Sequence, residues 1–341
     1  MQNAIMEKES LFGKNIDELK EVAVKSGMKE YTGKQIADWL YNKDIRGIDE
    51  MTNLSKKDRS VLNENYQIGL EDPVNEQKSA DGTKKYLFPV GENKFIEAAY
   101  IPEETRNTIC VSTQIGCKYG CVFCMTGRQG FQGNLTSGQI INQLKSLPEK
   151  EVISNIVLMG MGEPLDNLQE VMKALDVLTS NWGFAMSPRR ITLSTVGILP
   201  ALNEFLNKSE CHLALSLHSP FKEERQKLMP VENKYPFTKV LDQIKEIDWS
   251  GQRKFSIEYI VFKGINDSPK HARELSRLLK GIKCKVNIIR YHSIPGSKLQ
   301  GETYENMEVF QNELKSQGVF TTIRKSRGQD IAAACGLLST K

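Results

Sequence analysis

The sequence has 341 residues, of which 39% are hydrophobic and 26% charged, and its formal net charge is +4. This length fits either two domains or one α/β barrel with an appendage, and the charge is too small to demonstrate binding to nucleic acid. No long apolar run and no signal-peptide pattern occur, and three of the seven cysteines are clustered. We therefore expect a cytoplasmic protein without a membrane span or a disulfide framework.

The start of the chain is predicted to be a small helical region. Apolar residues recur at helical spacing in 15–26 and in 33–43. Aromatic residues stand beside lysine in 31–41, which fits an RNA-facing surface, but helix packing explains the aromatic residues better. From about residue 72 the pattern changes, and the alternating segments 83–89 and 94–101 predict two strands that are joined by a turn.

From residue 108 onward, predicted strands and helices alternate. The strands are expected at 108–112, 155–160, 190–195, 212–217, 255–262 and 286–289, and the helices at 137–147, 167–178, 198–207, 236–247, 268–280 and 304–317. Ser268 before Pro269 is a helix-capping signal, and Gly281 and Gly318 are natural helix stops. Six such units predict an α/β fold, a partial (βα)6 barrel with helices outside and chemistry at the carboxyl ends of the strands.

Cys117, Cys121 and Cys124 stand at C-x3-C-x2-C spacing, and Gly116 and Gly120 allow the backbone to wrap tightly around a metal centre. A structural zinc site usually takes four ligands in two separated pairs, and no second pair occurs near this motif. Iron–sulfur clusters normally take four protein ligands, so three cysteines suggest a cubane with one iron open to a small molecule. A chance cluster of inert cysteines is the weaker alternative.

Polar residues follow several of the predicted strands. Glycines in MGMGEPL, at 159–165, expose backbone to a ligand, and Glu163 could accept hydrogen bonds from an ammonium group. Ser194, His218 and Asn287 are further candidates at strand ends, where Ser194 or His218 could contact a ribose. A plain turn and a structural histidine are the alternatives, and a lone histidine is more often structural. Cys110 and Cys335 would by composition more often be structural thiols.

Acidic residues are missing between Glu104 and Glu149 and from windows 177–203 and 283–300. The basic residues in these windows include Arg106, Lys118, Arg128, Lys145, Arg189, Arg190, Lys283, Lys285, Arg290 and Lys298. If the windows meet around the cysteine cluster, the mouth of the pocket would be positive and suited to phosphate. A chance scatter of surface cations explains them equally well.

The three-cysteine motif, with Phe123 before the last cysteine, resembles the radical S-adenosylmethionine (radical SAM) superfamily. The resemblance implies that Cys117, Cys121 and Cys124 hold a [4Fe–4S] cluster and that SAM binds the open iron. Electron transfer then splits SAM into methionine and a 5′-deoxyadenosyl radical. The motif by itself does not indicate the substrate.

A closer resemblance rests on CVSTQIGCKYGCVFC, MGMGEPL, SPRRITLSTVG, SLHSP, VNIIRYH and IRKSRGQDIAAACG, in this order from about residue 94 to the C-terminus. Together these motifs resemble the bacterial adenine-C2 methyltransferases of 23S rRNA, many of which also modify tRNA. The helical start resembles the accessory domain of that family. The resemblance therefore implies an RNA-binding accessory domain at 1–70, an adaptor segment at 71–93 and a radical SAM barrel at 94–341 whose C-terminal extension carries Cys335.

The family resemblance also implies residue roles. Cys335 would be methylated by one SAM, and a radical from a second SAM would activate its methyl group for addition to C2 of a flipped adenine. Cys110 would resolve the covalent adduct by forming a disulfide, and Glu97 would move the substrate proton, although without the resemblance a polar position on an alternating strand is the better explanation of Glu97. The residues expected to contact SAM are Gly162, Glu163, Ser194, Ser216, Leu217, His218 and Asn287.

The implied partners are 23S rRNA, tRNA and a low-potential electron donor such as flavodoxin, with a monomeric enzyme and no membrane. Two alternatives are weighed against this interpretation. An adenine-C8 methyltransferase that confers antibiotic resistance shares the cysteines but tends to have alanine where Pro164 stands here. A non-enzymatic iron–sulfur electron carrier or RNA-binding protein would not need an open iron or the pair formed by Cys110 and Cys335.

Overall fold

The computed structural model describes residues 8–340. The chain divides into two compact units, each built from separated stretches of sequence. One unit combines the residues up to 72 with 135–150 and 169–187, and the other combines 73–134, 151–168 and 188 to the C-terminus. The domain boundaries suggested by the family resemblance stay a prediction. No helix among residues 8–340 is both long enough and apolar enough to span a bilayer.

The first unit is mainly helical. Its elements are β1 (Glu9–Ser10), α1 (Ile16–Lys25), α2 (Thr32–Ala37), a π-helical turn (Asp38–Asn42), α3 (Lys56–Asn65), β2 (Tyr66–Gln67), α5 (Ser137–Lys145) and most of α6 (Leu168–Thr179). The short strands β1 and β2 pair in parallel. Leu19, Val22 and Ile36 are buried in this unit, whereas Val24 is 57% exposed although it belongs to the apolar pattern of the first helix.

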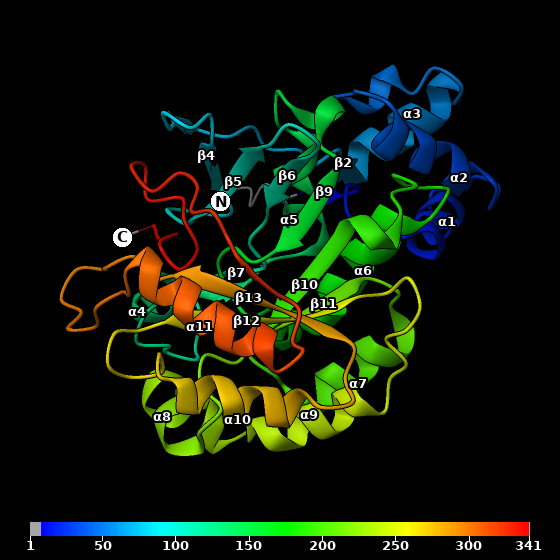
Figure 1. Ribbon diagram of the computed structural model, residues 1–341. Helices are drawn as coiled ribbons and strands as arrows, with labels where there is room; N and C mark the ends of the chain where they lie inside the picture. Colours follow the sequence, from blue (N-terminus) through cyan, green and yellow to red (C-terminus); the bar gives the residue numbers. More distant parts are fainter. Residues whose placement is uncertain (1–7, 341) are drawn as a thin grey trace. The chain divides into compact units, whose positions relative to one another are not determined.

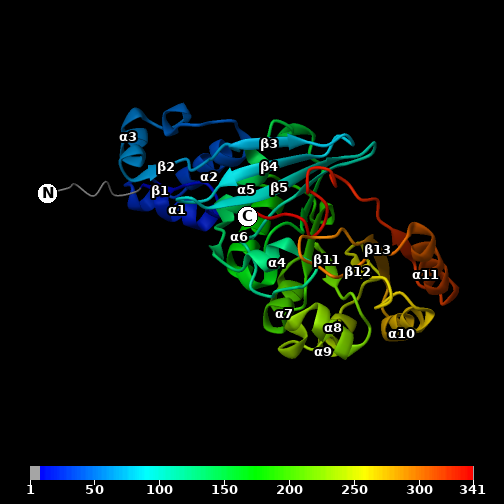
Figure 2. The same cartoon turned by 90° about the vertical axis from the view of Figure 1, so that its left-hand side faces the viewer.

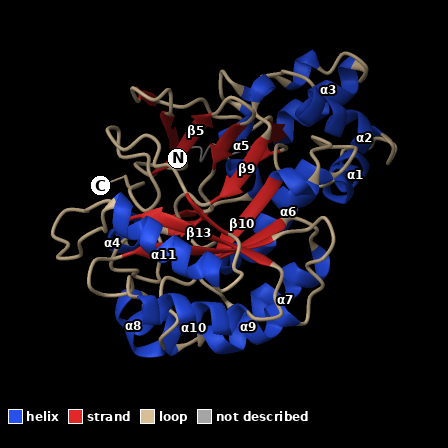
Figure 3. Cartoon of the chain, viewed as in Figure 1, coloured by secondary structure: helices blue, strands red, loops and turns tan. Residues whose placement is uncertain are grey.

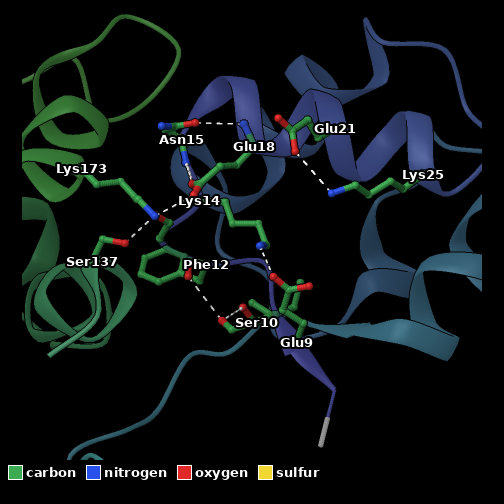
Figure 4. Close-up of polar contacts among 12 residues, drawn as sticks. Glu9, Ser10, Phe12, Lys14, Asn15, Glu18, Glu21, Lys25, Ser137 and Lys173 are labelled. Carbon is green, nitrogen blue, oxygen red and sulfur yellow. Dashed lines mark hydrogen bonds and ion pairs between the residues drawn. The ribbon is translucent and has the colours of Figure 1, made fainter. Parts of the chain in front are cut away.

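Local polar contacts define the start of α1 (Figure 4). Asn15 accepts from the backbone N–H of Glu18, whose carboxylate in turn accepts from the N–H of Asn15. This reciprocal capping satisfies two donors that a helix start leaves open. Glu18 also pairs with Lys173 at 2.7 Å, and Ser137 donates to the carbonyl of Gly13 at 2.8 Å. The cap and its partners thus tie stretches more than 100 residues apart into one unit.

The second unit contains a sheet of ten strands in the order β14-β13-β12-β11-β10-β9-β6-β5-β4-β3 (Figures 1 and 3). Its strands are β3 (Asn75–Lys78), β4 (Lys84–Pro89), β5 (Phe95–Pro102), β6 (Asn107–Cys110), β9 (Asn155–Leu158), β10 (Ile191–Thr195), β11 (His212–Ser216), β12 (Phe255–Val261), β13 (Cys284–Arg290) and β14 (Thr321–Ile323). The strands from β6 to β14 are parallel, and β3, β4 and β5 extend the sheet in antiparallel fashion. The expected parallel α/β architecture is confirmed, and β14 adds a parallel strand that the sequence pattern did not indicate.

The helices of the second unit lie along the outer side of strands β10 to β13 (Figure 1). They are α7 (Leu199–Lys208), α8 (Lys222–Leu228), α9 (Phe237–Lys245), α10 (Pro269–Leu279) and α11 (Tyr304–Ser316). The cysteine loop and the short α4 (Met125–Gln129) that follows it lie between the paired strands β7 (Gln114–Ile115) and β8 (Gly133–Asn134). Ser268 caps α10 as expected, in a capping box with His271. The seven-residue α8 was not expected, because its sequence KEERQKL has too few apolar positions to show a period.

Register aligns the inward-facing side chains of the parallel strands. Ser216 lies beside Glu258, Glu258 beside Asn287, and Asn287 beside Thr322 on four neighbouring strands. Because lateral neighbours in a sheet point to the same face, these four side chains form one polar row inside the barrel. After β14 the chain returns to the antiparallel strands (Figure 2), where Asp330 accepts from the hydroxyl of Ser79 at 2.6 Å.

Candidate active site

One cavity of about 960 Å³ occupies the interior of the second unit. It is lined by inward-facing residues of the parallel strands and by the C-terminal segment 324–338. Cys110, Cys124, Glu258, Asn287 and Cys335 all border it. The volume lies at the upper end of the range of natural ligand sites, so it has room for a nucleotide-sized ligand.

The three clustered cysteines lie in the loop between β7 and α4. A side chain at Gly116, which has φ +73°, would place its Cβ 1.7 Å from the carbonyl oxygen of Gly130, so this tight loop requires glycine there. Burial raises the pKa of Cys117 to about 12, and burial together with the neighbouring thiols raises the pKa of Cys121. Among residues 8–340 no three cysteine, histidine or acidic side chains stand ready in coordinating positions. The donor set still fits an iron–sulfur cluster, because three cysteines in one tight loop supply the thiolate ligands that such clusters take.

Glu163 follows β9 and is fully enclosed. Its carboxylate accepts from the hydroxyl of Thr195 at 2.6 Å and from the backbone N–H groups of Val196 at 2.9 Å and Leu165 at 3.1 Å. Burial raises the pKa of Glu163 to about 7, although these three donors oppose the shift. Gly162 before it has φ +101°, and a Cβ there would lie 2.6 Å from the side chain of Gln114. Packing alone therefore explains why Gly162 is a glycine.

His218 follows β11 in a left-handed backbone conformation, with φ +58°. Its Nδ1 accepts from the backbone N–H of Ile260 at 3.0 Å, and its carbonyl accepts from Asn266. The ring stands edge-on to Phe123 with centroids 4.8 Å apart. Burial lowers the pKa of His218 to about 3, so the ring is neutral, with its proton on Nε2. The preceding residues Ser216 and Leu217 offer their carbonyls to the buried Arg225.

A polar network built on Glu258 borders the two remaining cysteines. Glu258 accepts from Asn287 at 2.7 Å and pairs with Arg324 at 3.2 Å. Arg324 lowers the pKa of both Cys110 and Cys335 but does not overcome burial, which raises the pKa of Cys110 to about 12. Cys335 is solvent-accessible because it lines the cavity, while the protein around its thiol still raises its pKa. Both thiols are free and close enough for their charges to interact.

The residues that follow Cys335 in the C-terminal segment are bound by α4, the helix that follows the cysteine loop. Met125 donates its backbone N–H to the carbonyl of Gly336 at 2.8 Å, and the hydroxyl of Thr126 donates to the carbonyl of Leu338 at 2.7 Å. Glu97, on β5, accepts from the backbone N–H of Ser339 at 2.8 Å and pairs with Lys85 at 2.9 Å. Cys335 therefore lies between Arg324 and α4, whereas the carboxylate of Glu97 already has two partners.

Comparisons with known proteins agree with this geometry. A family model described as the radical SAM superfamily matches residues 111–275, and one described as the ribosomal RNA large subunit methyltransferase N-terminal domain matches residues 10–68. The probable dual-specificity RNA methyltransferase RlmN of Bacteroides thetaiotaomicron is 54% identical over 98% of this chain and 97% of its own length. The dual-specificity RNA methyltransferase RlmN of Syntrophus aciditrophicus is 43% identical over 96% of this chain and 95% of its own length. The chain belongs to the RlmN family.

A solved structure supports the same family at the level of the fold. The crystal structure of a radical SAM methyltransferase from Sphaerobacter thermophilus aligns over 98% of this chain and over the full length of its own chain. The TM-score is 0.90 and the sequence identity is 34%. As a member of the RlmN family the protein is a radical SAM RNA methyltransferase. Its cofactors are accordingly a [4Fe–4S] cluster, for which Cys117, Cys121 and Cys124 are the fitting donors, and SAM.

The acid-free windows do not bring all of their cations to the cysteine loop. Lys118 pairs with Asp166 at 2.7 Å, Arg128 donates to the carbonyl of Pro295, and Lys145 belongs to the other compact unit. Arg189, Arg190, Lys283 and Lys285 from the two later windows line the cavity at the amino ends of the strands, whereas Arg290 ends β13 and does not line it. A window defined along the sequence can include both the start and the end of a strand. The parallel sheet places strand starts and strand ends at opposite edges, so the cations of one window are separated.

Several residues of the site were not found by sequence reasoning. Arg225, Asn266 and Arg324 are the clearest examples, since each contacts residues from other elements. A signal did exist for Glu258. It alternates with Ser256 on an otherwise apolar strand, which places both on the inward face, and a buried carboxylate on that face needs a cationic partner.

Proposed function

We propose that the protein methylates C2 of adenine in 23S rRNA and in tRNA, with Cys335 as the methyl carrier, Cys110 as the resolving thiol and Glu97 as the group that moves the substrate proton. The term dual-specificity in the names of its relatives supports two RNA substrates. The observation that carries the proposal is one cavity bordered by Cys335, Cys110 and the cluster cysteine Cys124. C2 of adenine is not nucleophilic, so direct displacement from SAM would fail and a covalent carrier is needed.

Cys335 and Cys110 have separate roles in the proposed reaction. When bound, the cluster and SAM supply the methyl group and one-electron chemistry. Cys335 would link its sulfur through a methylene group to C2, whose hydrogen would leave as a proton to Glu97 while the remaining electron returns to the bound cofactors. Cys110 then attacks that sulfur as a thiolate. The new S–S bond forms as the S–CH2 bond breaks, and the carbon takes the electron pair and a proton, so the product carries a methyl group. A thiol reductant must reopen the disulfide before the next turnover.

The charges around the thiols fit this sequence. Cys110 is buried and neutral at rest, which protects it from premature reaction, and Arg324 is the cation that would stabilise its thiolate. Glu97 is held by Lys85 and by the backbone of Ser339. Its role in proton transfer therefore requires the C-terminal segment to release it during the cycle.

The remaining assignments complete the proposal. Glu163 would bind the SAM ammonium group, and Gly162, Ser194, Ser216, Leu217, His218 and Asn287 would shape the rest of the SAM site. The neutral Nε2–H of His218 is a donor suited to a ribose hydroxyl or the adenine. A low-potential donor such as flavodoxin would reduce the cluster, and the enzyme would act as a cytoplasmic monomer.

The decisive experiment is an anaerobic reaction with reconstituted protein, SAM, reductant and either a 23S rRNA fragment or a tRNA. Digested nucleosides are analysed by mass spectrometry for 2-methyladenosine. Product from both RNAs is expected. 8-Methyladenosine would replace the C2 assignment by C8 chemistry, and SAM cleavage without a methylated nucleoside would refute both RNA substrates.

SAM affinity is expected to depend on the ionisation of Glu163. Its pKa of about 7 means that the carboxyl becomes neutral as the pH falls, so SAM binding should weaken roughly tenfold between about pH 8 and about pH 6. The stability of the ligand-free protein changes with pH in the opposite direction. The folded state holds this proton more tightly than the unfolded state, so its stabilising contribution is present at low pH and is lost as the pH rises toward 7.

Calorimetric titration of SAM into the reconstituted protein across this pH range measures the effect. The matched control is Glu163→Gln, which keeps the shape but cannot ionise, and its weaker binding should not vary with pH. An equal slope in both proteins would show that another group controls SAM binding.

A further inference from the structure

Basic side chains surround the end of the cavity opposite the cysteine loop. Six cations line the cavity where parallel strands begin, namely Arg106 before β6, Arg189 and Arg190 before β10, Lys254 before β12, Lys283 before β13 and Lys285 at its second position. We call these six residues the basic ring. The cysteine loop follows the carboxyl end of β6, so the cavity connects the basic ring with the reactive thiols.

Few acidic groups neutralise the basic ring. Glu103 and Glu258 are the two carboxylates among the described residues that line the cavity, and each is already paired with an arginine, Arg106 and Arg324 respectively. Nine lysines and arginines line the same cavity. The cavity therefore carries a large excess of positive charge, which its low-dielectric walls concentrate at the mouth.

Apart from Arg106, no cation of the basic ring forms a salt bridge with the residues that the structure describes. Lys254 donates to the carbonyl of Gly251 at 2.7 Å and Arg190 to the carbonyl of Ser154 at 3.4 Å, and backbone carbonyls do not neutralise them. Within the part of the chain that the structure describes, no hydrogen bond or salt bridge is made by the side chains of Arg189 and Lys285.

Neighbouring groups respond to this positive potential. His212 begins β11 at the same end of the sheet, and burial lowers its pKa, assisted by the charges of Lys254 and Arg189. Burial likewise lowers the pKa of Lys285; the charge of Glu258 opposes this shift, and the charges of Arg324 and Arg106 add to it. These cations are close enough to repel one another, so a bound anion would relieve the repulsion.

We propose that the basic ring binds the sugar–phosphate backbone of the RNA substrate, so that the target adenosine enters the barrel from the amino ends of the strands and meets Cys335 from that side. This inference rests on the proposed function. Lys285, which is half-buried inside the barrel, faces the phosphate of the inserted nucleotide. Arg189 and Arg190, which are exposed at the mouth, face phosphates further along the strand.

The arrangement of the basic ring favours a nucleic-acid strand over a single small anion. The cations come from four separate segments of the chain that line the same end of the cavity. One phosphate group carries about two negative charges and cannot pair with all of them, whereas successive phosphates of a strand can. A flipped base also needs a wide cavity directly behind the phosphate contacts, and this cavity provides it.

The test measures RNA binding separately from methylation. A fluorescent anticodon stem-loop is titrated with full-length protein without SAM, and the dissociation constant is followed against salt concentration. Arg189→Gln combined with Arg190→Gln should lower the slope of log affinity against log salt by roughly 1 to 2, because two phosphate contacts are lost. Both residues are exposed, so the variant should fold normally. Lys285→Gln should lower the slope by about 1.

The matched control is Lys222→Gln combined with Lys227→Gln on α8, which removes the same charge from exposed positions that do not line the cavity. An unchanged slope in the control supports the proposal, and equal slopes in both double variants would overturn it. Tripolyphosphate that binds wild type as tightly as RNA does, without competing with RNA, would replace the RNA interpretation by a small-anion site. Wild type that forms 2-methyladenosine while the arginine variant binds RNA normally would refute this inference and leave the proposed function standing.

Discussion

Cys335→Ala is expected to form no 2-methyladenosine, a loss of at least about three orders of magnitude in rate, because a covalent carrier has no substitute once its sulfur is removed. SAM binding should survive, since Cys335 is not among the groups that donate to Glu163. The loss is measured by mass spectrometry of nucleosides after a single anaerobic turnover.

Cys110→Ala should fail at the next step. The methylene bridge between Cys335 and the adenine would form but could not be resolved, so the protein should accumulate as an RNA adduct. Denaturing gels before and after ribonuclease treatment detect this adduct, and its absence from the double variant with Cys335→Ala confirms the linkage. The control is Cys211→Ala, because Cys211 is buried but does not line the cavity. Full turnover by Cys110→Ala would remove Cys110 from the mechanism.

Arg225→Met is expected to destabilise the fold by about 3–5 kcal/mol, because it leaves Glu232 as an unpaired buried charge. Arg225 is 0% exposed, pairs with Glu232 and donates to the carbonyls of Leu217 and Val196 at 3.2 and 2.9 Å. It thus joins the carboxyl ends of β10 and β11, where Glu163 and His218 obtain their partners. Urea denaturation of the protein measures the change in the free energy of unfolding.

Two comparisons isolate the buried charge as the cause. Arg273→Met removes an exposed arginine that pairs with Glu313 at 3.2 Å, and its expected cost is below about 1 kcal/mol. Combining Arg225→Met with Glu232→Leu should recover much of the loss, because no charge then remains buried. If Arg225→Met costs no more than Arg273→Met, the buried pair does not hold these strand ends together.

Local features were predictable from the sequence by itself. The spacing of Cys117, Cys121 and Cys124 is a property of eight consecutive residues, so it indicates the cluster site before any fold is known. The alternation of strands and helices and the cap at Ser268 likewise depend on neighbours a few residues apart. The family resemblance supplied the expected roles of Glu97, Cys110 and Cys335, which no local pattern indicates.

Contacts between distant residues were decided by the tertiary structure. Cys110 and Cys335 border the same cavity because the chain after β14 returns to it. Glu258 pairs with Arg324 because β12 and the residue after β14 both face that cavity. The positive windows were visible in the sequence, but the direction of the parallel strands placed Arg189, Arg190, Lys283 and Lys285 at the end of the barrel away from the cysteine loop. A one-residue change of register would turn these side chains to the opposite face, so only the assembled sheet determines which charges share the cavity.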